Sequence, residues 1–93
     1  MRIEWNESKN KTNIAKHGVS FEEAQTVFYD PLTKVAADPD HSYDEERFIA
    51  VGLSSANRQL LVVHCHRDKV QLIRIISARK LTRSEKKQYE ELT

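Results

Sequence analysis

The residues best suited to chemistry lie between Leu60 and Tyr89, where two histidines are followed by a series of arginines and lysines. Histidine exchanges protons near neutral pH, and the planar guanidinium of arginine binds two phosphate oxygens at once. Such groups suit cleavage of RNA without a metal: the 2′-hydroxyl attacks its own phosphate, a base and an acid move the protons, and cations stabilise the charge on phosphorus. The candidate residues are His64, His66, Arg67, Arg74, Arg79, Lys80, Arg83 and Tyr89.

The distribution of charge favours a phosphate-binding surface in the same part of the chain. Residues 1–56 carry six Lys/Arg and ten Asp/Glu, a balance of −4. Residues 57–87 carry nine Lys/Arg and two Asp/Glu, a balance of +7, and residues 88–93 add −2, which gives the total of +1. A basic segment of this kind is the electrostatic footprint of a phosphate-binding protein. The alternative is a solvated charged face that binds nothing.

Several of these side chains also have a purely structural interpretation. A histidine on a sheet face can be a half-buried, hydrogen-bonded spacer, and this alternative applies to His64 more than to His66, which lies beside Arg67 near a turn. Arg74 lies in an apolar strand and must find a partner, either an acid or a bound phosphate. Cys65 is interpreted as a structural thiol and not as a nucleophile.

Hydrophobic patterning predicts strands over residues 2–5, 33–37, 47–54, 59–67 and 70–78. Asn6 is a suitable N-cap for a helix over residues 7–17, and Gly18 suits the left-handed position that ends it. Ser20, with a glutamate three residues later, begins a second helix that the Asp-Pro pair at residues 30–31 ends. Thr82 begins a last helix through about residue 92 by the same capping pattern.

The strands at residues 59–67 and 70–78 are predicted to form a hairpin with a turn at residues 68–69. If His66 lies opposite Val70, His64 lies opposite Leu72 and Val62 opposite Arg74. This register gathers His64, His66 and Arg74 on one polar face of the hairpin. The core face would then carry Leu61, Val63, Cys65, Ile73 and Ile75.

The predicted order β-α-α-β-β-β-β-α indicates one α+β domain over residues 1–93, with an antiparallel sheet, two N-terminal helices packed on one face and a C-terminal helix. A single cysteine is typical of a reducing compartment, and the chain has neither a signal-like leader nor an apolar run of membrane-spanning length. We therefore expect a cytoplasmic protein with no membrane partner. The turn that contains Asp38, Asp40 and His41 is interpreted as a solvated loop, so no metal site and no cofactor are expected.

Three separated blocks of the sequence resemble the BrnT family of toxins. The blocks are KHGVSFEEA from Lys16, the segment from Glu46-Arg47 to Gly52, and RIISAR from Arg74 to Arg79. They occur in the family's order, and the likeness extends over nearly the whole chain. The resemblance implies a RelE-like fold and a ribonuclease toxin of a type II toxin–antitoxin pair that inhibits translation. It also implies neutralisation by a BrnA-like antitoxin, through whose DNA-binding domain the complex contacts operator DNA.

The resemblance also implies roles for individual residues, because RelE-like toxins use basic and polar side chains of the sheet and adjoining helix instead of a metal. By position, Arg67, Arg79 and Tyr89 are the matching residues, and His64 stands where the family has His or Tyr. At His66 the chain departs from relatives that carry an acidic residue before the arginine. The general base is then either His66 or no residue at all.

The leading hypothesis is a metal-independent endoribonuclease toxin. In it, His64, His66, Arg67, Arg79 and Tyr89 are catalytic, and Arg74, Lys80 and Arg83 bind RNA. A second hypothesis is a non-catalytic toxin homologue that only binds its antitoxin or RNA. A third is direct binding of DNA by the last helix, against which two consecutive glutamates at residues 90–91 count.

Overall fold

The computed structural model describes residues 1–39, 46–67 and 71–92. Asp40, His41 and the predicted hairpin turn, including Val70, lie outside the described residues. The second α-helix continues into a short 3₁₀ helix. This 3₁₀ helix is the one element that the sequence does not predict. The elements are β1 (Arg2–Glu4), α1 (Glu7–His17), α2 (Phe21–Ala24), the 3₁₀ helix η1 (Gln25–Tyr29), β2 (Lys34–Ala37), β3 (Arg47–Leu53), β4 (Gln59–Arg67), β5 (Leu72–Lys80) and α3 (Arg83–Leu92).

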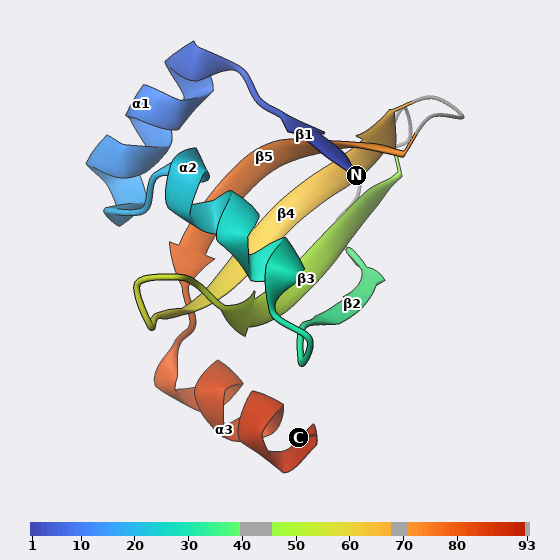
Figure 1. Ribbon diagram of the computed structural model, residues 1–93. Coiled ribbons are helices and arrows are strands. Elements are labelled where there is room, and N and C mark those ends of the chain that lie inside the picture. Colours follow the sequence, from blue (N-terminus) through green and yellow to red (C-terminus); the bar gives the residue numbers. More distant parts are fainter. Residues whose placement is uncertain (40–45, 68–70, 93) are drawn as a thin grey trace.

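The strands form one five-stranded sheet in the order β1-β5-β4-β3-β2 (Figure 1). Strands β2 to β5 are antiparallel neighbours, as predicted. Strand β1 instead runs parallel to β5, so the prediction of a purely antiparallel sheet is wrong. No short turn joins the two strands: the whole chain from α1 to β4 lies between them, and only strands joined by a tight hairpin have to be antiparallel. The fold is therefore α+β with a mixed sheet.

The register of the β4–β5 hairpin differs from the predicted one. His64 pairs with Ile75 and not with Leu72, and Val62 pairs with Ala78 and not with Arg74. A register irregularity lies at residues 63–64. Because β4 is apolar on both faces, either face could have been buried, and alternation alone did not decide between them. The face of β4 predicted to be polar is in fact the face under the helices.

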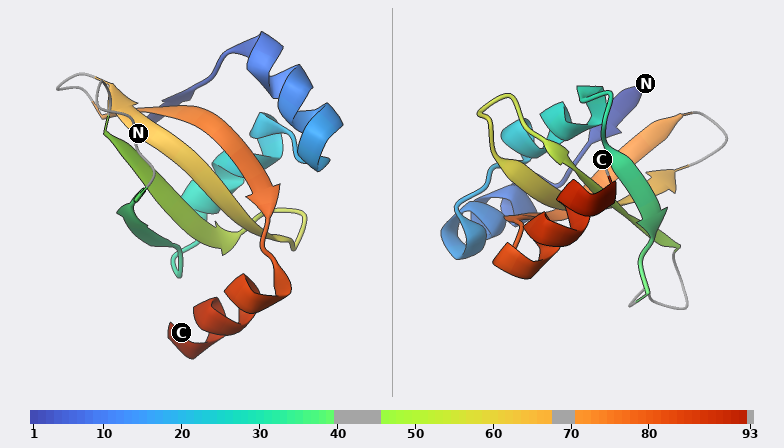
Figure 2. Two further views of the ribbon diagram at one scale, coloured as in Figure 1. Left: turned by 180° about the vertical axis from the view of Figure 1, so that it is seen from behind. Right: turned by 90° about the horizontal axis from the view of Figure 1, so that it is seen from below.

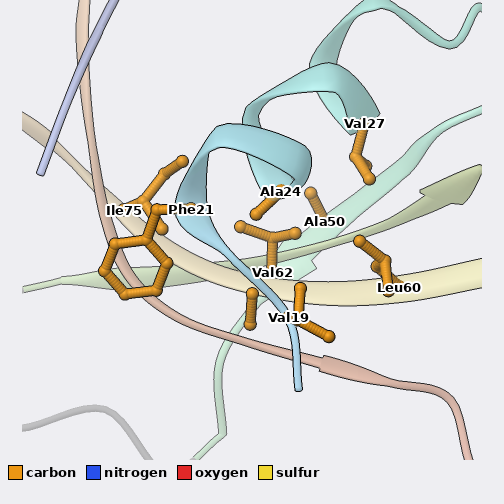
Figure 3. Close-up of a cluster of buried hydrophobic side chains, with 9 residues drawn as sticks. Val19, Phe21, Ala24, Val27, Ala50, Leu60, Val62 and Ile75 are labelled. Carbon is orange, nitrogen blue, oxygen red and sulfur yellow. The ribbon is translucent and has the colours of Figure 1, made fainter. Parts of the chain in front are cut away.

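Helix α2 and η1 cover one face of the sheet and bury the hydrophobic core (Figures 1 and 3). Phe21, Ala24 and Val27 of this helical segment are fully buried, and Leu60 and Val62 of β4 meet them from the sheet. The predicted capping by Ser20 is confirmed, because its side chain accepts a hydrogen bond from the Glu23 amide. Burial of this apolar surface is the main favourable term in folding.

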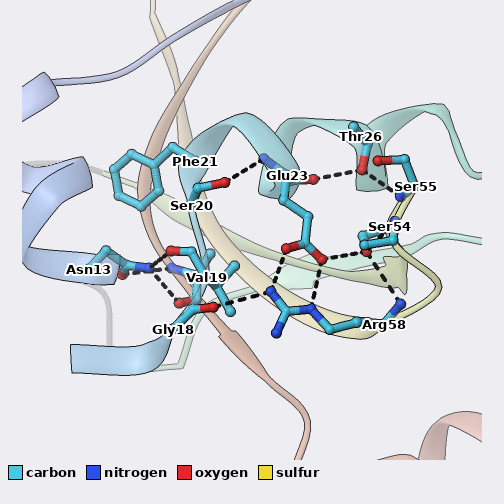
Figure 4. Close-up of polar contacts among 12 residues, drawn as sticks. Asn13, Gly18, Val19, Ser20, Phe21, Glu23, Thr26, Ser54, Ser55 and Arg58 are labelled. Atoms are coloured by element: carbon cyan, nitrogen blue, oxygen red, sulfur yellow. Dashed lines mark hydrogen bonds and ion pairs between the residues drawn. The ribbon is translucent and has the colours of Figure 1, made fainter. Parts of the chain in front are cut away.

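Helix α1 attaches to the sheet through polar side chains, since its apolar Ile14 is 44% exposed. The buried Asn13 amide donates to the carbonyls of Val19 and Ala78, at 2.8 Å each, and its oxygen accepts from the Ala78 amide at 3.1 Å (Figure 4). Gly18 ends the helix in the predicted left-handed conformation, with φ of 68°. These bonds attach α1 to β5, the strand with which β1 pairs.

Helix α3 lies on the side of the sheet away from α2 (Figure 2). The predicted capping box is confirmed, because the Thr82 amide donates to the Glu85 carboxylate at 2.8 Å and the Thr82 hydroxyl accepts from the Glu85 amide at 3.2 Å. No residue of α3 is fully buried. Within the described ranges, no helix has the length and apolar character needed to cross a membrane.

Candidate functional site

The two faces of the sheet separate the candidate residues. We call the face beneath α2 and η1 the covered face, and the opposite one the open face. His64 lies on the covered face, where its side chain is 1% exposed and its ring meets Phe28 edge-on at 4.9 Å. Its Nδ1 donates to the Val62 carbonyl at 3.3 Å. Burial lowers the pKa of His64, the Val62 hydrogen bond partly opposes this shift, and the charge of His66 adds to it.

His66 is exposed at the end of β4, on the same side of the sheet as His64. Its ring lies 5.0 Å from that of Phe48 and 5.6 Å from that of His64. Arg74 pairs with Cys65, which alternates with the two histidines and so points to the other side of the sheet. The predicted grouping of His64, His66 and Arg74 on one face is therefore wrong, and its cause is the misassigned register.

Four arginines gather on the open face, at the end of the sheet near the β4–β5 hairpin. Arg47 pairs with Cys65 and Cys65 with Arg74, so the two arginines flank the cysteine in one row across three strands. Arg67 and Arg2 flank Leu72 in the next row. Directly paired residues share a face, and rows two residues apart along a strand share it too. We call Arg2, Arg47, Arg67 and Arg74 the arginine face.

Within the described part of the chain, these guanidiniums have few partners of opposite charge. Arg74 forms an ion pair with Glu4, with Nη1 3.3 Å from the carboxylate, and Glu4 is the one acid that the described strand residues place on the open face. Among the described residues, no ion pair joins Arg2, Arg47 or Arg67 to an acid. The Nε of Arg47 is buried and has no hydrogen-bond partner in this part of the chain. An arrangement of this kind favours a bound anion, because buried and clustered donors gain most from a charged acceptor.

Arg79 lies on the open face as well, but at the opposite end, and it is engaged by α3. Its two terminal nitrogens donate to the two oxygens of Glu85 at 2.8 and 2.9 Å. The Arg79 hydrogen bonds, opposed in part by desolvation and assisted by Thr82, hold the pKa of Glu85 at about 2. Bidentate pairing is a strong and directional contact. In this structure Arg79 therefore connects the sheet to α3.

The remaining candidates lie around α3. The Tyr89 hydroxyl donates to the Leu32 carbonyl at 3.2 Å, and burial, followed by the charge of Asp30, raises the pKa of Tyr89. Lys80 and Arg83 are exposed at the end of β5 and the start of α3. Between α3 and the open face lies an apolar hollow of about 350 Å³, lined by Ile49, Val51, Leu61, Tyr89 and Leu92 among others.

Sequence reasoning found Arg67 and Arg74 of the arginine face but missed Arg2, Arg47 and Glu4. The signal for these residues was present, because each occupies a polar position next to an apolar one in a predicted strand. Their convergence depends on the parallel pairing of β1 with β5, which brings Glu4 opposite Arg74, and on the true hairpin register. Neither was predicted.

Comparison with known proteins gives the chain a family. Residues 5–85 match the family model described as the ribonuclease toxin, BrnT, of type II toxin–antitoxin systems. Among solved structures, the chain is similar to the Brucella abortus ribonuclease toxin BrnT, with a TM-score of 0.63 and 26% sequence identity over 89% of this chain and 99% of that one. The search of curated proteins gave no match. Because the family model matches residues 5–85, from the residue after β1 into the first turn of α3, this chain belongs to the BrnT family of toxins of type II toxin–antitoxin systems.

Proposed function

We propose that the chain is a metal-independent endoribonuclease toxin that binds RNA across the arginine face and inhibits translation by cutting it. The observation that carries the proposal is the gathering of Arg2, Arg47, Arg67 and Arg74 at one end of the open face, with Glu4 as the one acid that the described strands place beside them. Family membership supports the ribonuclease class, and a RelE-like mode of action is part of the proposal.

The arginines would act mainly through electrostatic stabilisation. Attack of a 2′-hydroxyl concentrates negative charge on the phosphate oxygens, and fixed guanidiniums stabilise this charge without having to reorganise. Arg67 and Arg74 are diagonal neighbours on adjacent strands, about 7–8 Å apart, which the long side chains can span, so one phosphate can bind to both forks. Lys80, which pairs with Leu60 of the covered face, and Arg83 lie at the other end of the sheet, so they would bind only RNA that extends beyond the arginine face, while Arg79 orients α3.

Neither His64 nor Tyr89 belongs to the proposed site. His64 is enclosed beneath η1, and the Tyr89 hydroxyl already donates to a carbonyl. His66 is exposed but on the other side of the sheet from the arginine face. The catalytic roles first predicted for these three residues therefore give way to the arginines.

The type II toxin family implies an antitoxin partner. We propose that this partner is BrnA-like, that it shields the arginine face with acidic residues, and that the toxin meets operator DNA only through it. Complementary charge accelerates association, which suits neutralisation of a toxin. We further infer that the toxin acts in the cytoplasm. We also infer that residues 1–93 form one domain, since β1 near the start of the chain pairs with β5 near its end.

The proposal is tested with purified protein and RNA in the presence of EDTA. The wild type should cut RNA, and Arg67→Ala and Arg74→Ala should each slow cleavage by at least about 100-fold, the loss typical of removing a donor to a developing oxyanion. Lys87→Ala, which removes an exposed charge from α3, is the matched control and should cut normally. Loss of wild-type cleavage in EDTA, with recovery on adding Mg²⁺, would contradict the metal-independent mechanism.

A second candidate function is a non-catalytic module that binds RNA or its antitoxin. The position of His64 and His66 on the other side of the sheet from the arginine face favours it, since none of the described histidines offers an imidazole there for proton transfer. Induced expression separates the two candidates. Growth arrest accompanied by cut RNA supports the enzyme, whereas intact RNA with retained binding supports the module.

A further inference from the structure

Glu4 is placed where a proton acceptor is needed beside the arginine face. It occupies β1 opposite Arg74, in the row that continues through Cys65 to Arg47. Its side chain is 41% exposed, and its carboxylate contacts Arg74 Nη1 at 3.3 Å, a single contact longer than a strong charge-assisted hydrogen bond. One oxygen therefore remains open to a ligand lying on the sheet.

We propose that Glu4 is the general base of the ribonuclease reaction and accepts the proton of the attacking 2′-hydroxyl. The proposal rests on the proposed function and adds the group that the arginines cannot supply, since a guanidinium stays protonated. Glu4 and the β4 strand that carries Arg67 are two strand spacings apart, about 10 Å, which leaves room for a ribose and its phosphate between the base and the anion-binding forks.

The step balances without a co-reactant. The 2′-oxygen loses its proton to Glu4 and forms a bond to phosphorus, and the bond from phosphorus to the 5′-oxygen breaks. Water gives a proton to the departing 5′-oxygen, and the hydroxide formed takes the proton from Glu4. The products are a 2′,3′-cyclic phosphate and a 5′-hydroxyl, and the carboxylate is restored. Arg74, held by Glu4 itself, would stabilise the negative charge on the same phosphate.

The other titratable groups on or near the open face are less suitable. Glu85 gives both oxygens to Arg79 and one of them also to the Thr82 amide, so neither is open to a ribose. Cys65 is fully buried in the row between Arg47 and Arg74. Among the described strand residues, the charged groups that share the open face with Glu4 at this end are therefore cationic: Arg2 from its own strand, Arg74 from β5, and Arg67 and Arg47 from β4 and β3.

The test separates binding from chemistry in the full-length protein. Glu4→Gln keeps the shape and the contact with Arg74 but cannot accept a proton, so kcat should fall by about 100-fold or more. Binding of an RNA with a 2′-deoxy substitution at the cut site should be unchanged or tighter, because one negative charge is lost. The pH–rate profile of Glu4→Gln should lack the acid limb that the wild-type profile shows. Glu91→Gln, an equal charge change on exposed α3, is the control and should behave as wild type.

Each alternative outcome identifies what has failed. A wild type that cuts no RNA overturns the proposed function. A wild type that cuts, together with Glu4→Gln of normal kcat and an intact acid limb, overturns only the assignment of Glu4. If Glu4→Gln loses binding and cleavage in proportion, Glu4 merely positions Arg74 and the inference also fails. If Glu4→Gln melts at a lower temperature than the wild type, Glu4→Asp becomes the deciding variant. It keeps a carboxylate one methylene further from the substrate, so its pH–rate profile should retain the acid limb while its kcat falls.

Discussion

The covered and open faces of the same sheet are built by opposite means. On the covered side, apolar residues close over the sheet and polar groups are paired, as in the Asn13 bonds to Ala78 and the ion pair of Glu23 with Arg58 (Figure 4). At the hairpin end of the open face, four arginines stand together with one strand carboxylate, that of Glu4, among the described residues. Stability favours the first arrangement, because like charges repel in the absence of a ligand. The second is therefore better explained by function.

This difference separates the residues that identify the family from those that would perform its chemistry. In the block at residues 16–24, Gly18 ends α1, Ser20 begins α2, Phe21 fills the core, and Glu23 binds Arg58 and Ser54. All four roles concern the docking of the helices. A likeness based on this block indicates the fold more directly than it indicates an active site.

The largest effect is expected where the covered side depends on polar bonds. Asn13→Ala leaves three buried backbone groups without partners and should lower the free energy of unfolding by about 3 kcal/mol. Ile14→Ala, at the next residue of the same helix but exposed, should change it by less than about 0.5 kcal/mol. Urea titration of both variants measures the difference. Equal losses would show that α1 docks through apolar contact instead.

On the open face, replacing one side chain by alanine should weaken RNA binding and leave the stability of the fold unchanged. Arg47→Ala removes one guanidinium of the arginine face and should weaken RNA binding about tenfold, with a salt dependence reduced by about one unit of slope. Its free energy of unfolding should stay within about 0.5 kcal/mol of the wild type, since Arg47 has no ion pair among the described residues. Fluorescence anisotropy over a salt series measures the binding. A stability loss with an unchanged slope would make Arg47 structural.

Local signals in the sequence predicted most elements but not the way in which they meet. Capping by Asn6, Ser20 and Thr82, and the stop at Gly18, depend on neighbouring residues alone, and all four are confirmed. The parallel pairing of β1 and the hairpin register depend on contacts far apart in the sequence. Ile73 and Ile75 of β5 are buried under the helices, and β4 has two apolar faces that could have lain beside them. The sequence does not show which face does so.

The candidate site shows the same limit. Arg67 and Arg74 were predicted from residue type, and the structure brings them together. The histidines were assigned to the same face through a register that placed His64 opposite Leu72, whereas its true partner is Ile75. Since a shift by an odd number of residues exchanges the two faces of a strand, this single error moved both histidines to the wrong side. No feature of the histidines themselves could have corrected it.

A smaller effect should distinguish His64 as a core residue from His64 as a catalyst. Burial lowers its pKa, so the folded protein holds it neutral while the unfolded chain binds a proton as the pH falls below about 6.5. Stability should therefore decrease as the pH falls through that range, and His64→Phe should reduce this decrease without slowing RNA cleavage. His66→Gln, at the exposed strand end, is the control. Urea titrations at pH 7.5 and 5.5 measure the slope, and an unchanged slope or a large loss of cleavage in His64→Phe would contradict the assignment.

The smallest effect is expected at Tyr89, where the open face meets α3. Tyr89→Phe removes one hydrogen bond to the Leu32 carbonyl at a largely exposed site, which should cost about 0.5 kcal/mol of stability. RNA cleavage should stay within about twofold of the wild type, because a proton donor to the leaving oxygen would contribute at least about 100-fold. The two magnitudes differ enough for one kinetic measurement to decide. A 100-fold loss in Tyr89→Phe would mean that α3 moves to bring the hydroxyl onto the arginine face when RNA binds, and that catalysis uses both ends of the open face.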